Sequence, residues 1–123
     1  MEGHEETLFE RGKIYVVGMP VRGNWGIHRL RTEVKALFGV DDGTELWVCF
    51  TTRSRQRLLI YHQDVSGRDV RVRLLRQGFF HIFEETVRKG ITRQQLRRLL
   101  FDGTFEGQWQ NPLSEGYLKA RKE

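Results

Sequence analysis

The sequence predicts an α+β domain, an antiparallel β-meander of four to five strands with two amphipathic helices packed on it. Between residues 45 and 83, short runs rich in Val, Leu, Ile, Phe, Tyr and Trp alternate with short polar connectors, which is typical of antiparallel strands. Segments 25–38 and 92–101 carry apolar residues at helical spacing. A length of 123 residues suits one core rather than two. We therefore expect a single domain over 1–123, with a loose leader at 1–11 and a frayed basic tail at 110–123.

The first two elements precede the meander. Residues 13–17 (KIYVV) predict a strand that ends at Gly18 and Pro20. The helix over 25–38 has Asn24 as its expected N-cap and Gly39 as its expected end. Its apolar positions fall at spacings of three and four and so share one face: Ile27, Leu30, Val34 and Leu37.

The next strands differ in their apolar pattern. Segments 46–50 and 58–61 are apolar on both faces, and we expect Cys49 to be a small residue of the core. Such strands are covered on both faces, either by the chain itself or on one side by a partner. The fourth strand alternates instead, with Val70, Val72 and Leu74 expected inward and Arg71 and Arg73 outward.

The last elements follow a turn at Gln77-Gly78. The aromatic run 79–83 (FFHIF) predicts a fifth strand, and the pattern of the segment that follows it is ambiguous. Thr92 followed by Gln95 has the spacing of a capping box at the start of the second helix. Gly103 is its expected end.

The charge balance favours an acidic partner. The formal net charge is +5, and arginine, whose guanidinium matches phosphate and carboxylate groups, dominates between residues 53 and 76. The sequence has one cysteine, an acidic polar start and no apolar run of membrane-spanning length, so we expect a cytoplasmic protein without a cofactor. A solvated basic surface that only keeps the protein soluble is the simpler interpretation.

Six arginines are the candidate binding residues: Arg53, Arg55, Arg57, Arg71, Arg73 and Arg76. If the connector before the third strand adjoins the outer face of the fourth, five or six guanidiniums line one surface. That surface suits the phosphates of nucleic acid or the acidic face of a partner protein, and the sequence does not separate the two. Trp47 and Tyr61 fit stacking groups for single strands, although core positions suit them better.

Catalytic patterns are absent from the sequence, and we expect no enzyme. The four histidines show no metal-ligand spacing, and no glycine-rich phosphate loop or nucleophile elbow occurs. The alternative is a small metal-dependent nuclease in which His62 and Asp64 act with Glu84 or Glu85. A further alternative is a protein–protein adaptor whose two-sided apolar strands cover a dimer interface.

The order of several short motifs resembles a known family. They are Gly26-Ile27-x-x-Leu30, Leu46-x-Val48, an arginine-rich connector ending at Arg57, Asp64-x-x-Gly67, Leu75-x-x-Gly78-x-Phe80, and Thr92-x-x-Gln95-Leu96-x-x-Leu99-Leu100 followed by Gly103. Together they resemble the TnpB-type accessory proteins, encoded by the second open reading frame of the IS-sixty-six class of bacterial insertion sequences. The resemblance spans residues 13 to 104.

The resemblance implies an accessory protein of transposition that works beside a separate transposase, with DNA or the transposase as partner and no active site of its own. The chain departs from the family pattern at several positions. Asn24-Trp25 replaces an Arg-Lys pair, Leu59 a lysine, Gln63 a tryptophan and Arg68 an aromatic residue, whereas Arg73 retains a basic position.

Overall fold

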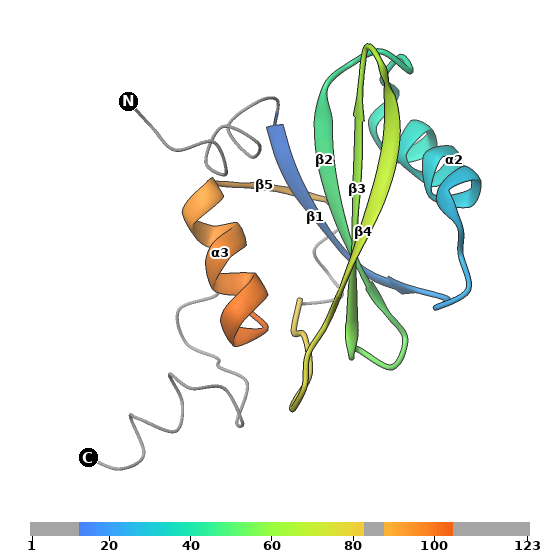
Figure 1. The fold of residues 1–123 in the computed structure, drawn as a ribbon. Coiled ribbons are helices and arrows are strands. Elements are labelled where there is room, and N and C mark those ends of the chain that lie inside the picture. The colour runs from blue at the N-terminus through green and yellow to red at the C-terminus, as the bar shows by residue number, and fades with distance from the viewer. Residues whose placement is uncertain (1–12, 83–87, 105–123) are drawn as a thin grey trace.

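The computed structural model describes residues 13–82 and 88–104 of the chain. Its elements are β1 (Lys13–Val21), α2 (Ile27–Phe38), β2 (Leu46–Thr52), β3 (Arg57–Asp64), β4 (Gly67–Leu74), β5 (Lys89–Ile91) and α3 (Arg93–Asp102). The strands form one five-stranded sheet in the order β4-β3-β2-β1-β5 (Figure 1). The predicted α+β class is confirmed. The predicted leader 1–11 and tail 110–123 lie outside the described residues.

The sheet is mixed rather than wholly antiparallel. Strands β2, β3 and β4 form the predicted antiparallel meander, and β5 runs antiparallel to β1. Strand β1, however, pairs with β2 in parallel, with Ile14 opposite Trp47 and Val16 opposite Cys49. Helix α2 causes this difference, because it connects the two strands and returns the chain to the end at which β1 began.

Strand β1 is longer than the sequence predicts. It continues through Gly18 and Pro20 to Val21, whereas we expected it to end at Val17. The pairing register with β2 shifts between Val17 and Val21. A local irregularity of this kind accommodates proline, which cannot donate a hydrogen bond to a neighbouring strand.

Two apolar cores lie on the two faces of the sheet. The α2-side core includes the buried residues Val17, Val21, Leu30, Val34, Leu46, Val48, Phe50, Leu59 and Tyr61. The α3-side core includes the buried residues Ile14, Val16, Trp47, Cys49, Leu58, Ile60, Phe80, Ile82, Ile91, Leu96 and Leu99. The prediction that β2 and β3 are covered on both faces is confirmed, and the chain's own helices supply the cover (Figure 1).

The helices begin and end close to the predicted residues. Helix α3 has the predicted capping box, in which the Thr92 hydroxyl accepts from the Gln95 backbone N–H and the Gln95 side chain accepts from the Thr92 N–H. Gly39 and Gly103 end the two helices in the left-handed conformation, as expected. The predicted N-cap at Asn24 is wrong, since Gly26 occupies that position without a side-chain cap.

The predicted fifth strand at 79–83 is wrong for residues 79–82, and residue 83 lies outside the described part of the chain. Phe80 and Ile82 are fully buried, which accounts for the apolar pattern. Their segment is irregular and is held by single backbone hydrogen bonds, from Phe80 N–H to the Arg55 carbonyl and from His81 N–H to the Gly103 carbonyl. The fifth strand is instead β5, which pairs with β1.

The burial of strand β4 also differs from the prediction. It forms one edge of the sheet among the described residues, and only Val70 is partly buried, against the α2-side core. Val72 and Leu74, predicted inward, are 58% and 60% exposed. Arg71 and Arg73 pair with Ile60 and Leu58, so they project on the α3 side of the sheet. The side chains of β4 therefore alternate as predicted, but Val72 and Leu74 are exposed rather than buried.

Cys49 gives a first testable expectation. Burial raises the pKa of its thiol from 9.0 to about 12, so the folded state binds a proton that the unfolded state releases above pH 9. The protonated Cys49 thiol therefore contributes fully to the stability of the fold below pH 9, and this contribution is lost as the pH rises toward 12. Because this is the only cysteine, we expect a thiol reagent to label native protein at pH 8 only at the rate of global opening, and urea-unfolded protein at once. Fast labelling of the native protein would contradict the burial.

Among the described residues, no helix is long and apolar enough to cross a membrane.

Candidate functional site

Arg71 and Arg73 form the exposed basic row of β4. Their side chains lie two residues apart on the α3 side of the strand, and both residues are exposed. The Arg71 Nε is 3.8 Å from an Asp69 carboxylate oxygen, in an ion pair whose side chains are each about half exposed. Such exposed pairs hold a guanidinium only weakly. Both arginines are therefore accessible to an anionic ligand.

The other four predicted arginines occupy the end of the sheet where β2 turns into β3 and where β4 ends. Arg53 and Arg76 are exposed in these connectors. Arg57 is exposed too but lies opposite Leu74, on the face away from Arg71 and Arg73. Arg55 is partly buried, has a positive φ of 62°, and its Nη1 lies 3.4 Å from the Ile82 carbonyl oxygen. The structure thus divides the predicted arginine array between two faces of the sheet. Arg55 lies in the turn between β2 and β3, where its side chain contacts the Ile82 carbonyl.

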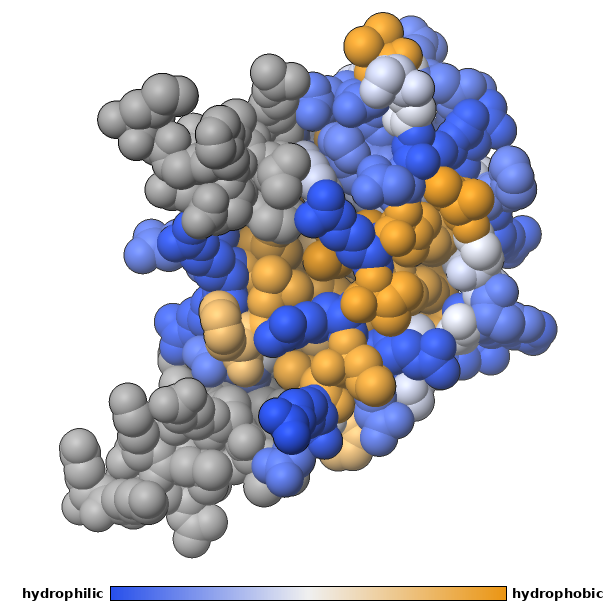
Figure 2. Space-filling view, in the orientation of Figure 1, coloured by the Kyte–Doolittle hydropathy of each residue, from blue (hydrophilic) through white to orange (hydrophobic). Residues whose placement is uncertain are grey.

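An exposed aromatic ring lies beside the basic row. Phe101 on α3 is 71% exposed, and the Arg73 guanidinium carbon is 5.8 Å from its ring centroid. The ring also borders an open depression of about 700 Å³ along α3, lined by Gln94, Gln95, Arg97, Arg98, Phe101 and Asp102. Figure 2 shows hydrophobic residues gathered in the middle of this side of the molecule, with hydrophilic residues set among them. Proteins that bind single-stranded nucleic acid commonly combine aromatic faces with neighbouring basic groups.

Trp47 and Tyr61, considered as stacking groups, are core residues. They are 1% and 0% exposed. Tyr61 donates from its hydroxyl to the Gln63 side-chain oxygen at 2.8 Å. Neither ring is accessible to a base.

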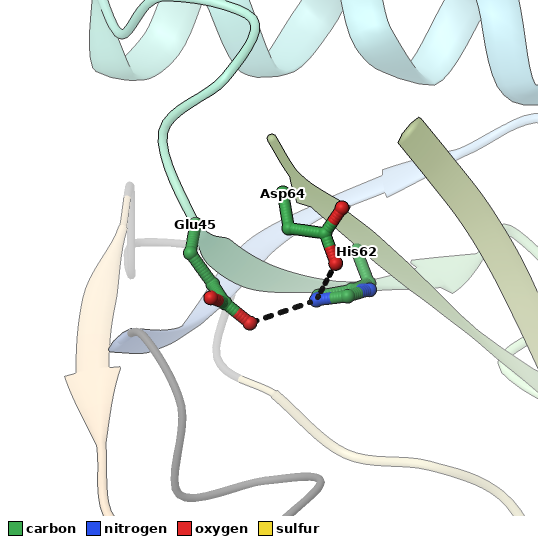
Figure 3. Close-up of side chains that lie close together, drawn as sticks. All are labelled: Glu45, His62 and Asp64. Carbon is green, nitrogen blue, oxygen red and sulfur yellow. Dashed lines mark hydrogen bonds and ion pairs between the residues drawn. The ribbon is translucent and has the colours of Figure 1, made fainter. Parts of the chain in front are cut away.

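A second group of polar side chains meets where β2 begins and β3 ends. Glu45, His62 and Asp64 place one ligand atom each within 4.8 Å of one another. The His62 Nε2 points at both carboxylates, 3.4 Å from Glu45 Oε2 and 3.9 Å from Asp64 Oδ2 (Figure 3). The His62 side chain is 15% exposed, and those of Glu45 and Asp64 are each 31% exposed.

Neighbouring groups fix the orientation of this cluster. The His62 ring is stacked on Trp47 with 3.8 Å between centroids, and its Nδ1 is 3.0 Å from Asp69 Oδ1. Asp64 Oδ1 accepts hydrogen bonds from the Ser66 hydroxyl and the backbone N–H groups of Ser66 and Gly67. These bonds, the Ser66 hydroxyl first, lower the pKa of Asp64. The second oxygen of Asp64 is left to face His62.

Glu45 is the residue that the sequence hypothesis missed. The predicted nuclease centre paired His62 and Asp64 with Glu84 or Glu85, which lie outside the described residues. The hairpin register contained the missing signal: Leu46 pairs with Gln63, so the residue before Leu46 falls opposite Asp64.

Side-chain hydrogen bonds from β3 and α2 hold the loop that carries Glu45. The Gln63 amide nitrogen donates to the backbone carbonyls of Asp41 and Thr44 at 2.8 and 2.9 Å. The guanidinium of Arg31 on α2 donates to both carboxylate oxygens of Asp42, at 3.1 and 2.7 Å. This contact lowers the pKa of Asp42. The loop is therefore anchored to both β3 and α2 immediately before Glu45.

Comparison with known proteins gives no match: no protein-family model, no curated protein and no solved structure matches the chain.

Proposed function

We propose that this protein binds nucleic acid through the surface formed by the basic row of β4 and the neighbouring face of α3, and that it does so as a non-enzymatic accessory protein of a transposable element. The observation that carries the proposal is the exposed pair Arg71 and Arg73 beside the exposed ring of Phe101. Guanidiniums neutralise phosphates, and an adjacent aromatic ring stacks with a base.

The surroundings of this pair support nucleic acid as the ligand. Arg97 and Arg98 line the depression that Phe101 borders, so cations from β4 and α3 flank the same ring. Arg53 and Arg76 extend the positive charge to the end of the sheet. A strand of nucleic acid running along β4 would meet phosphate partners on either side of a stacked base.

The transposition context rests on the motif order given above. The resemblance to TnpB-type accessory proteins covers the strands and helices that form this surface, and Arg73 retains the basic position of that pattern. The transposase is the alternative partner, since the same guanidiniums fit an acidic protein face.

The test is fluorescence-anisotropy binding of the full chain to a labelled duplex and a labelled single strand over a range of salt concentrations. We expect the wild-type affinity to fall with salt, with a log–log slope of several units. Replacing Arg71 and Arg73 by alanine removes two phosphate contacts and lowers the magnitude of the slope by about 0.9 for each contact on duplex DNA. The substitutions leave the fold intact, because exposed side chains contribute within about 0.5 kcal/mol.

The matched control replaces Arg29 and Lys35, two exposed cations on α2, which lies on the other side of the sheet. It removes the same charge and is expected to bind nearly as well as wild type. If both double variants lost the same affinity for nucleic acid, the net charge of the protein alone would account for the effect. Wild-type protein that binds neither strand at low salt would contradict the nucleic-acid proposal and make an acidic protein, the transposase first, the partner to test.

The non-enzymatic part of the proposal has its own outcome. Labelled DNA incubated with the protein and Mg²⁺ or Mn²⁺ is expected to stay intact. Cleavage that Asp64→Ala abolishes would favour the metal-dependent nuclease instead.

A further inference from the structure

We infer that Glu45, His62 and Asp64 form a binding site for a first-row divalent metal ion, with Zn²⁺ as the best fit. The three ligand atoms come from the residue just before β2 and from the end of β3, and they lie within 4.8 Å of one another (Figure 3). One imidazole nitrogen and two carboxylate oxygens make up a donor set that suits this ion.

The distances between the three ligand atoms suit a metal site, although two of them also qualify as ion pairs. A charge-assisted hydrogen bond between nitrogen and a carboxylate is about 2.7–2.9 Å long. The His62 Nε2 is 3.4 Å and 3.9 Å from the two carboxylate oxygens, which is long for such bonds. Ligands bound to tetrahedral zinc at about 2.0–2.2 Å lie about 3.3–3.6 Å apart. The Glu45 contact falls in that range, the Asp64 contact at 3.9 Å lies just above it, and all three ligand atoms lie within 4.8 Å of one another, so a bound ion would draw the two carboxylates closer together.

The other nitrogen of His62 behaves differently. Its Nδ1 is 3.0 Å from Asp69 Oδ1, an ordinary hydrogen-bond length. In the tautomer in which the Nδ1–H group donates this hydrogen bond to Asp69, the lone pair of the ring is on Nε2, the nitrogen that faces Glu45 and Asp64. A carboxylate that holds the second nitrogen of a metal-bound histidine is the usual outer partner in zinc sites.

The ligands are held in place, and the site has room for a further ligand. Asp64 Oδ1 is held by donors from Ser66 and Gly67, so Oδ2 keeps its direction toward His62. The ring of His62 is fixed by its stack on Trp47. The partial exposure of Glu45 and Asp64 leaves room for water as a fourth ligand.

The test is isothermal titration of the full chain with ZnCl₂ after treatment with a chelator, in the absence of nucleic acid. We expect one site. Glu45→Gln replaces a direct ligand and is expected to weaken zinc binding at least as much as the loss of an outer partner of a metal site, which costs about tenfold or more. Glu33→Gln on α2 is the matched control and should leave the affinity unchanged. His62→Gln should weaken binding as Glu45→Gln does.

A spectroscopic readout locates the ion. In a Trp25→Phe/Trp109→Phe variant, Trp47 is the only tryptophan. Because its ring is stacked on His62, Cu²⁺ or Co²⁺ bound at Nε2 should quench its fluorescence, and Glu45→Gln should move that quenching to higher metal concentration. Absence of zinc binding, or binding and quenching that Glu45→Gln leaves unchanged, would overturn the proposal. Either result leaves the nucleic-acid proposal untouched, since no nucleic acid is present.

Discussion

Replacing Trp47 with alanine is expected to lower the free energy of unfolding by about 3–5 kcal/mol, the usual loss for a large aromatic side chain removed from a core. Trp47 is 1% exposed and belongs to the α3-side core. It also supports the stacked ring of His62, with 3.8 Å between centroids. A loss of this size is a large part of the total stability of a small domain, about 5–15 kcal/mol. Urea unfolding followed by circular dichroism measures it.

Trp25 provides the matched control for this prediction. It is only partly buried, at the edge of the α2-side core, and its ring lies under the exposed guanidinium of Arg29. Trp25→Ala removes the same side chain and should cost clearly less stability. Equal losses for the two variants would place Trp47 outside the core.

Replacing Gln63 with leucine is expected to have the next largest effect. Gln63 is 4% exposed and satisfies three partners, namely the Tyr61 hydroxyl and the carbonyls of Asp41 and Thr44. Each buried polar group left without a partner costs about 1–3 kcal/mol. The Tyr61 hydroxyl is the most deeply buried of these groups, so its loss of a partner should account for the largest part of the lost stability. Denaturant unfolding of the variant gives the total.

A double-mutant cycle separates this hydrogen bond from a loss of packing. Removing both partners, as Tyr61→Phe with Gln63→Leu, leaves no unsatisfied hydroxyl, so the double variant should be less destabilised than the sum of the two single variants. Strict additivity would mean that the Tyr61–Gln63 contact contributes nothing to stability.

The fold was predictable wherever a local pattern determined it. The helical spacing of Leu30 and Val34 and the capping box at Thr92 depend on neighbouring residues alone, and both helices formed as predicted. The parallel pairing of β1 with β2 follows from the strand–helix–strand order of β1, α2 and β2, a signal that the prediction of an antiparallel meander did not use. Phe80 and Ile82 misled for a related reason: an apolar run indicates burial equally well in a strand and in an irregular segment.

The candidate sites were predictable in composition but not in arrangement. The alternation of β4 correctly placed Arg71 and Arg73 on one face, yet it could not show that Val72 and Leu74 lie beyond the cover of α2. The approach of Phe101 to Arg73 joins two segments through tertiary packing. Glu45 reaches His62 across a hairpin, and so its role follows from strand register rather than from any sequence motif.

The pairing of β5 with β1 has a consequence for biosynthesis. Ile14, near the start of the described chain, pairs with Ile91, near its end. During N-to-C-terminal synthesis, α2 and the first four strands emerge while the outer edge of β1 still lacks its neighbour and the face that α3 will cover is still open. The nascent chain therefore presents an apolar surface and an unpaired strand edge until residues 89–102 have left the ribosome. A chain interrupted before that point should be a target for chaperones and proteases rather than a shorter version of the same domain.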